Sequence, residues 1–174
     1  MSFLASQDNH TALTQRAAAI ELAVFDVDGV MTDGKLYLAA DGSETKTMHV
    51  RDGLGLKRLM AAGVDIAVIS GRPSQAVAAR LADLGIEDVY LACDDKPGRL
   101  AELSAARGLS AHQIAAMGDD RPDLTIMQDA GLALATADAM PEVRRVAHWI
   151  SALPGGHGAV REACELMIAA RETP

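Results

Sequence analysis

Aromatic and basic residues are scarce in this sequence of 174 residues. Aromatic side chains make up 3% of the chain, and 16 lysines and arginines stand against 24 acidic residues, giving a formal net charge of −8. Nucleic-acid-binding proteins need a basic surface and usually aromatic rings on which bases stack. We therefore expect no nucleic-acid partner, and a phosphorylated substrate must meet local rather than overall positive charge.

Cysteines and long apolar segments are also few. Cys93 and Cys164 lie far apart and match no metal-binding or redox spacing, which favours two reduced thiols. No stretch approaches 18 consecutive apolar residues, and residues 1–19 lack the basic region and apolar segment of a secretory signal. We expect no membrane partner and a cytoplasmic protein.

The remaining composition is that of one globular domain, with 49% hydrophobic and 23% charged residues. We divide the chain into an N-terminal extension with a helix (1–19), a single domain (20–170) and a tail (171–174). Within the domain, residues 34–50 form two alternating runs around an Asp-Gly-Ser turn, which predicts a projecting β-hairpin.

Outside the hairpin, apolar segments of strand and helix period alternate along the chain. Strands are predicted at 21–26, 64–69, 89–92, 113–117 and 132–135. Helices are predicted at 11–19, after Gly53, from Pro73 as the first helical residue to a stop at Gly85, at 96–107 and at 159–170. This alternation predicts an α/β fold with a doubly wound, Rossmann-like parallel sheet.

The first strand delivers two carboxylates to its C-terminal end. Four apolar residues precede Asp26, as in a strand that is buried on both faces. Asp26 and Asp28 are two residues apart, so in extended backbone both side chains point the same way, about 6 to 7 Å apart. Carboxylates this close repel each other unless a cation lies between them. A hard divalent cation such as Mg²⁺ would serve, with a phosphate as its natural co-ligand.

Other reactive residues follow other predicted strands. Ser70 follows the second, and Asp119, Asp120 and Asp123 follow a later one, while Lys96 begins a helix on the same side. Because parallel strands place their C-termini at one edge, we expect these groups to converge. Taken singly, Ser70 could be a helix cap and Lys96 a surface charge.

Four segments of the sequence resemble the motifs of the haloacid dehalogenase-like phosphohydrolases in order and spacing. They are Asp26-Val27-Asp28-Gly29-Val30, Ser70-Gly71-Arg72, Lys96 and Gly118-Asp119-Asp120-Arg121-Pro122-Asp123. A closer resemblance is to the 3-deoxy-D-manno-octulosonate 8-phosphate phosphatase family of lipopolysaccharide biosynthesis. It lies in Thr32-Asp33-Gly34, in residues 50–55, and in Gly155-Gly156-His157-Gly158-Ala159-Val160-Arg161-Glu162.

The resemblance implies a Mg²⁺-dependent phosphatase that works through an aspartyl-phosphate. Asp26 would be the nucleophile, and Asp28 would protonate the leaving group and then activate water. Mg²⁺ would be held by Asp26, the Asp28 backbone carbonyl and Asp119.

The resemblance also implies the groups around this centre. Ser70 and Lys96 would hold the phosphoryl oxygens, and Asp120 and Asp123 would orient the metal ligands from outside. The residues in stretches that resemble substrate-contacting regions are Asp28, His49, Arg51, Asp52, Gly53, Lys57, Gly71, Arg72, Arg80 and Lys96. Several could equally be ordinary hairpin-end or helix-face residues.

The segments between the motifs are too short to hold a cap domain, so the site would be open to water. We expect neighbouring subunits to cover it, with the hairpin docking in a homotetramer, the assembly of the family that the chain resembles. His157 and Ala152 stand where the family often has Arg, which leaves the substrate open: another ulosonate, such as a nonulosonate 9-phosphate, is an alternative. Two alternatives to a phosphatase come from other functional classes: the chain could be a phospho-receiver domain, or a catalytically inactive binding or oligomerisation module.

Overall fold

The computed structural model describes residues 11–172. Residues 11–18 are helical, in line with the predicted N-terminal helix. The elements that follow are β1 (Leu22–Phe25), β2 (Tyr37–Leu38), β3 (Glu44–Thr45), α2 (Val50–Ala61), β4 (Asp65–Ile69), α3 (Gln75–Leu84), β5 (Asp88–Tyr90), α4 (Lys96–Arg107), η1 (Ala111–Gln113), β6 (Ile114–Gly118), η2 (Arg121–Asp123), α5 (Leu124–Asp129), β7 (Leu132–Ala135), α6 (Pro141–Val146), β8 (Trp149–Ile150) and α7 (Ala159–Glu172).

Six of these strands form one parallel sheet in the order β5-β4-β1-β6-β7-β8. β1 lies inside the sheet, between β4 and β6, and all four of its residues are buried. The predicted doubly wound α/β fold is therefore confirmed. Because the strands are parallel, the C-terminal ends of β1, β4 and β6 lie at one edge of the sheet. The chain crosses outward from β1 in both directions, and such folds bind ligands at this point of the edge.

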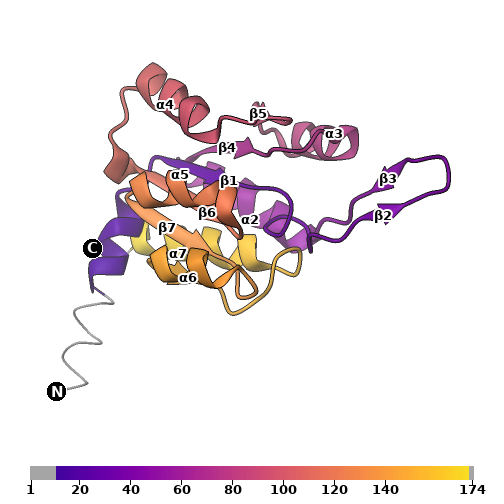
Figure 1. The fold of residues 1–174 in the computed structure, drawn as a ribbon. Coiled ribbons are helices and arrows are strands. Elements are labelled where there is room, and N and C mark those ends of the chain that lie inside the picture. The colour runs from indigo at the N-terminus through magenta and orange to yellow at the C-terminus, as the bar shows by residue number, and fades with distance from the viewer. Residues whose placement is uncertain (1–10, 173–174) are drawn as a thin grey trace.

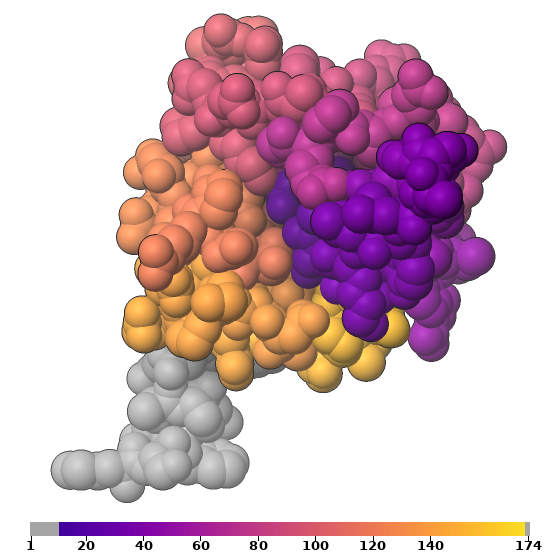
Figure 2. Space-filling view, turned by 45° about the vertical axis from the view of Figure 1, so that its right-hand side comes forward, coloured from indigo at the N-terminus to yellow at the C-terminus, as the bar shows by residue number. Residues whose placement is uncertain are grey.

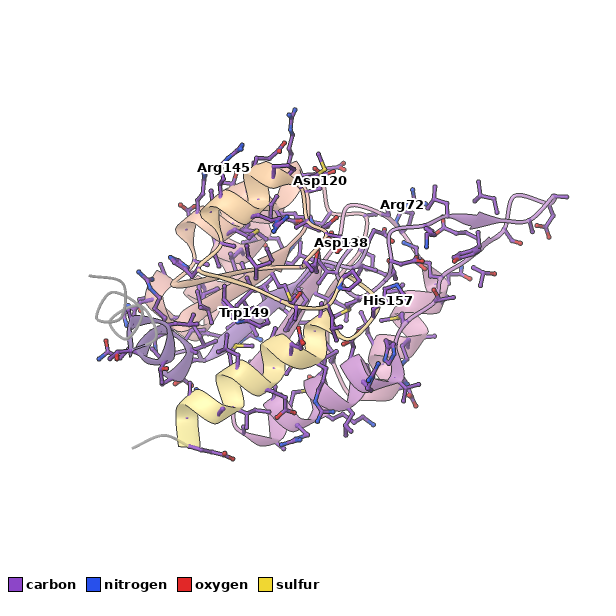
Figure 3. All side chains as sticks on the ribbon, turned by 90° about the horizontal axis from the view of Figure 1, so that it is seen from below. Arg72, Asp120, Asp138, Arg145, Trp149 and His157 are labelled. Carbon is purple, nitrogen blue, oxygen red and sulfur yellow. The ribbon has the colours of Figure 1, made fainter. Side chains whose placement is uncertain are left out.

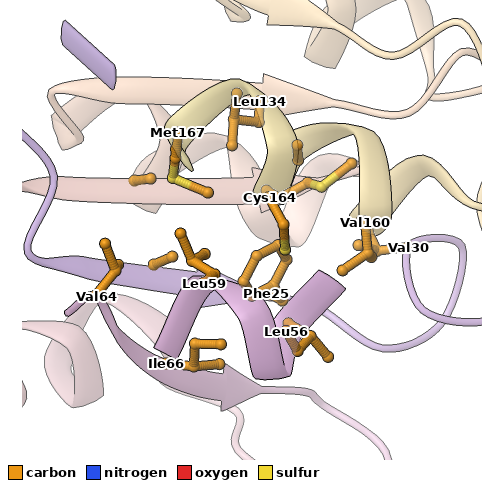
Figure 4. Close-up of a cluster of buried hydrophobic side chains, with 14 of the residues drawn as sticks. Phe25, Val30, Leu56, Leu59, Val64, Ile66, Leu134, Val160, Cys164 and Met167 are labelled. Carbon is orange, nitrogen blue, oxygen red and sulfur yellow. The ribbon is translucent and has the colours of Figure 1, made fainter. Parts of the chain in front are cut away.

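Helices cover both faces of the sheet (Figure 1). On one face, alternate strand residues such as Phe25 and Leu134 belong to a buried cluster that includes residues of α2, α3 and α7. Figure 4 shows the part of this cluster at α2 and α7. On the other face, residues such as Val24 pack against α4, α5 and α6. The alternation follows from the two-residue period of a strand, which sends successive side chains to opposite faces.

The predicted hairpin is present as the two-stranded antiparallel sheet β2–β3, which projects away from the main sheet (Figure 1). Gly42 has φ +84°, and the Asp41 carboxylate accepts a hydrogen bond from the Ser43 backbone N–H at 2.9 Å, so the turn uses the residues that the sequence indicated. Within residues 11–172, the chain between β1 and β4 holds only the hairpin and α2, so no separate cap domain is present there.

Several boundaries differ from the sequence-based predictions. Pro73 is not the first helical residue: Ser74 is the N-cap, its hydroxyl accepting the Val77 N–H at 3.3 Å, and α3 begins at Gln75, two residues after Pro73. α2 begins at Val50, before the predicted start, and α7 continues into the predicted tail. Residues 1–10 of the predicted extension and the last two residues of the tail lie outside the described residues.

None of the helices in residues 11–172 combines the length and the apolar character needed to cross a membrane.

Candidate active site

A cavity of about 560 Å³ lies at the C-terminal edge of the sheet. It brings together residues that are distant in the sequence, as the convergence of parallel strand ends requires. Among its lining residues are Asp26, Asp28, Ser70, Gly71, Arg72, Lys96, Asp119, Asp120 and Asp123. In Figure 2 the early part of the chain, in indigo, meets the later magenta and orange segments on one face of the molecule.

Asp26 is the first residue after β1, and its N–H donates to the Met117 carbonyl at 3.1 Å, which continues the pairing with β6. Lys96 Nζ lies 2.9 Å from Asp26 Oδ1. Burial raises the pKa of Asp26 to about 6, the charge of Asp123 adds to the rise, and the Lys96 ammonium opposes it. The Asp26 carboxylate is thus largely buried and has one cationic neighbour, Lys96.

Asp119 follows β6 and faces Asp26. Burial, followed by the charges of Asp123 and Asp26, raises the pKa of Asp119 to about 8. Its Oδ1 atom is buried and has no hydrogen-bond partner. An orphaned buried carboxylate oxygen beside a second carboxylate is the environment that a bound cation would satisfy.

The geometry fits one divalent cation. Carboxylate oxygens of Asp26, Asp119 and Asp123 lie within 4.8 Å of one another. Mg²⁺ prefers carboxylate oxygens as ligands, and its charge would offset the repulsion among the three carboxylates. A bound Mg²⁺ would also lower the raised pKa values of Asp26 and Asp119.

Asp123 is held by protein groups on both of its oxygens. Oδ1 accepts from Lys96 Nζ at 2.7 Å, and Oδ2 accepts from the Asp119 N–H at 3.1 Å and the Asp120 N–H at 3.4 Å. Gly118 makes this possible, because a Cβ there would lie 2.3 Å from the Asp123 Cβ. Asp123 thus orients Lys96 and the Asp119 backbone, while Asp26 and Asp119 keep oxygens free for a cation.

Asp28 lies in a tight turn rather than in extended backbone. The Val27 carbonyl accepts from the N–H groups of Val30, Met31 and Thr32, so the chain bends directly after Asp26. The expectation that Asp26 and Asp28 share one face of an extended strand is therefore wrong, although both side chains reach the same cavity.

The Asp28 carboxylate contacts the hairpin. Lys46 Nζ lies 2.5 and 2.6 Å from its two oxygens and 3.5 Å from Glu44 Oε1. The Lys46 side chain is only 3% exposed. Arg72 completes the cluster, with Nε 3.6 Å from Asp28 Oδ2 and Nη2 bonded to Glu44. The sequence analysis missed Lys46 and Glu44, although their spacing of two residues in an alternating run places both on one face of the hairpin.

Two further lining residues of the cavity, Ser70 and Lys96, are suited to phosphate. Ser70 is 2% exposed and follows β4, and Lys96, 5% exposed, is the first residue of α4. Burial lowers the pKa of Lys96, but the carboxylates of Asp26 and Asp123 more than offset it, so the net shift is upward and the ammonium stays charged. A buried hydroxyl and a buried ammonium can both donate to phosphoryl oxygens.

Six of the residues predicted to contact the substrate do not line this cavity. His49, Arg51, Asp52, Gly53, Lys57 and Arg80 belong to α2, its N-cap and α3. Asp52 is buried and accepts the Arg161 N–H of α7 at 2.8 Å, and burial raises its pKa. Arg80 bonds Asp83 at 2.8 Å. A substrate contact for this group stays a prediction.

The chain is similar to proteins of known family over most of its length. A sequence model of haloacid dehalogenase-like hydrolases matches residues 94–161. The 3-deoxy-D-manno-octulosonate 8-phosphate phosphatase KdsC of Yersinia pestis is 41% identical over 158 residues, covering 91% of this chain and 84% of the relative.

Solved structures agree with these sequence matches. A haloacid dehalogenase superfamily (subfamily III A) hydrolase from Legionella pneumophila superposes with a TM-score of 0.95 at 39% identity, covering 97% of this chain and 93% of that one. The Moraxella catarrhalis 3-deoxy-D-manno-octulosonate 8-phosphate phosphatase, solved with magnesium, phosphate and KDO, has a TM-score of 0.90 at 38% identity, with 92% of each chain covered.

Proposed function

Because this chain belongs to the 3-deoxy-D-manno-octulosonate 8-phosphate phosphatase family of haloacid dehalogenase-like hydrolases, we propose that it hydrolyses that sugar-acid phosphate to the free sugar acid and phosphate. The reaction is a Mg²⁺-dependent phosphoric monoester hydrolysis in lipopolysaccharide precursor biosynthesis. The observation that carries the proposal is the meeting of Asp26, Asp119 and Lys96 in one cavity.

Two transfers on Asp26 account for the chemistry. A carboxylate oxygen of Asp26 forms a bond to phosphorus while the bond from phosphorus to the sugar oxygen breaks, and water then attacks phosphorus and releases Asp26. Asp28 gives a proton to the departing sugar oxygen and later takes one from the attacking water. Lys46 holds the Asp28 side chain at the cavity wall during both transfers.

Charge around the phosphate is balanced by the chain and by the cation. Asp26, Asp119 and the Asp28 backbone carbonyl would hold Mg²⁺, which supplies the positive charge that lets an anionic carboxylate approach an anionic phosphate. Lys96 fixes Asp26 and donates to the phosphoryl oxygens, and the Ser70 hydroxyl donates a further hydrogen bond to them. Arg72, 45% exposed, can turn from Glu44 to a substrate carboxylate, which it would bind in a bidentate manner.

A phosphate-release panel tests the function. With Mg²⁺, we expect 3-deoxy-D-manno-octulosonate 8-phosphate to be hydrolysed with the highest kcat/KM, and Asp26→Asn to abolish release. Preference for a nonulosonate 9-phosphate would correct the substrate but keep the mechanism. Undiminished release by Asp26→Asn would contradict the covalent mechanism, and no release from any sugar-acid phosphate would favour a binding module.

We also propose that the protein is a cytoplasmic homotetramer whose hairpins cover neighbouring sites. Leu36, Tyr37 and Leu38 on the hairpin are 48%, 47% and 66% exposed, an apolar surface that a subunit contact would bury. Sedimentation should give four times the chain mass, and Leu38→Lys should lower it. A monomer with full activity at assay concentration would contradict the tetramer.

A further inference from the structure

The glycine-rich segment before α7, residues 154–158, lies directly behind the turn that carries Asp28. Gly155 is buried, and a Cβ at this position would lie 1.9 Å from the Gly29 carbonyl oxygen and 2.5 Å from its carbon. It would also lie 2.9 Å from the Thr32 carbonyl oxygen. No side chain fits there unless the Gly29 peptide moves by about 1 Å, because contacts under 3.0 Å do not persist.

Gly29 also contacts one of the proposed metal-binding acids, Asp119. A Cβ on Gly29 would lie 2.0 Å from Asp119 Oδ2, so the Asp119 carboxylate packs directly on the Gly29 backbone. Gly29 has φ +86°, a conformation that glycine adopts without strain. Gly29 is therefore in close contact with both Gly155 and Asp119.

Hydrogen bonds hold the segment 154–158 in this place. The Gly156 N–H donates to the Val30 carbonyl at 3.0 Å, and the Gly155 N–H donates to Asp138 Oδ1 at 3.0 Å. Two residues beyond Asp138, the Met140 N–H donates to the Asp119 carbonyl at 2.8 Å. In Figure 3, Asp138 and His157 lie near the centre of the view, below Asp120 and Arg72 and close to the start of the yellow helix α7.

We propose that Gly155 is a positioning residue for the metal site: it sets the distance between the Gly29 turn and the Asp119 carboxylate. This inference rests on the proposed Mg²⁺ site. A side chain at position 155 forces the Gly29 peptide to move, and the Asp119 carboxylate packs directly on Gly29. Mg²⁺ tolerates little departure from near-ideal octahedral geometry at about 2.0 to 2.1 Å. The glycine-rich segment 154–158 thus affects Mg²⁺ binding by positioning the Gly29 backbone, and not by contacting the substrate.

The test is the equilibrium affinity for Mg²⁺ alone, measured by titration calorimetry on the full chain without substrate. We expect Gly155→Ala to weaken Mg²⁺ binding at least tenfold. The matched control is Gly131→Ala, whose Cβ would lie 2.5 Å from the His112 carbonyl oxygen, at the opposite end of β7 from the site. It should lose comparable stability in urea and keep the wild-type affinity for Mg²⁺.

Wild-type affinity in a folded Gly155→Ala variant would overturn the inference and leave the proposed function intact. Equal weakening in Gly131→Ala would overturn it too, because general destabilisation would then explain the loss. A wild-type chain that binds no Mg²⁺ would contradict the metal site and the inference together.

A second pair of variants avoids the steric clash, in case Gly155→Ala does not fold. Asp138→Ala removes the acceptor of the Gly155 N–H, and we expect about threefold weaker Mg²⁺ binding. Asp138→Asn keeps an acceptor oxygen and should bind Mg²⁺ as the wild type does. Equal weakening in both would assign the effect to the charge of Asp138, and no weakening in Asp138→Ala would show that this bond does not position the turn; either result contradicts the inference.

Discussion

Asp119→Asn should make the metal-free protein more stable while removing its response to Mg²⁺. The cause is the pKa of Asp119, which burial and the neighbouring carboxylates raise from its ordinary value of 3.8 to about 8. In the unfolded chain Asp119 loses its proton near pH 4, whereas in the folded chain it keeps it to about pH 8. Stability therefore falls as pH rises through this window.

The size of the effect follows from that window. At about 1.4 kcal/mol for each pH unit, the upper bound at pH 8 is about 6 kcal/mol. Asp119 is partly exposed, and solvent screening reduces this to about 1 to 3 kcal/mol. An asparagine has no charge to bury, so the variant should be more stable than the wild type by that amount at pH 8 in a chelator, and nearly equal to it at pH 4.

Urea unfolding followed by circular dichroism measures the free energy of unfolding of both proteins at pH 4 and at pH 8. Adding Mg²⁺ at pH 8 should stabilise the wild type by about 2.7 kcal/mol at a hundred times its dissociation constant, and the variant far less. Asp41→Asn, on the exposed hairpin turn, is the matched control and should respond to Mg²⁺ as the wild type does. An Asp119→Asn protein that is less stable than the wild type in chelator at pH 8 would refute the reasoning.

Three further predictions concern the hairpin, the α2–α7 contact and the core. Lys46→Met should lower kcat about 10- to 100-fold, because Asp28 loses the nearer of its two cationic neighbours. The control Lys35→Met, at a side chain that is 70% exposed, should stay within twofold of the wild type, and full activity of Lys46→Met would contradict the role of Lys46. Asp52→Ala should reduce the free energy of unfolding in urea by about 1 to 2 kcal/mol, because the Arg161 N–H at the start of α7 loses its acceptor, and KM should be unchanged. A raised KM at unchanged stability would support a substrate contact of Asp52 instead. Leu134→Ala should cost about 2 to 5 kcal/mol in the same assay, and a loss below about 1 kcal/mol would contradict the close packing around it.

The main sheet could be predicted because its strands have strong local signals. β1 is a short apolar run buried on both faces, and the start of α4 at Lys96 and the end of α3 at Gly85 follow from residues with clear capping behaviour. α5, α6 and β8 were missed. α6 has six residues, of which only Val143 is buried, so its sequence has almost no helical period.

The candidate site was predicted from its acids but not from the groups that hold them. Lys46 meets Asp28 across 18 residues of chain, and only the path of the hairpin brings them together. Asp52 has the residue type of a ligand-binding acid, yet the packing of α2 against the start of α7 gives its carboxylate a backbone partner, the Arg161 N–H. The close approach of Gly155 to Gly29 likewise depends on tertiary packing, which no local pattern of residues specifies.

Anomalous diffraction from crystals soaked in Mn²⁺, a substitute for Mg²⁺, tests the central claim most directly. The account predicts one strong peak between Asp26 and Asp119, at about 2.0 to 2.3 Å from a carboxylate oxygen of each. A peak that contacts only one of these two residues, or that lies elsewhere on the protein, would contradict the account.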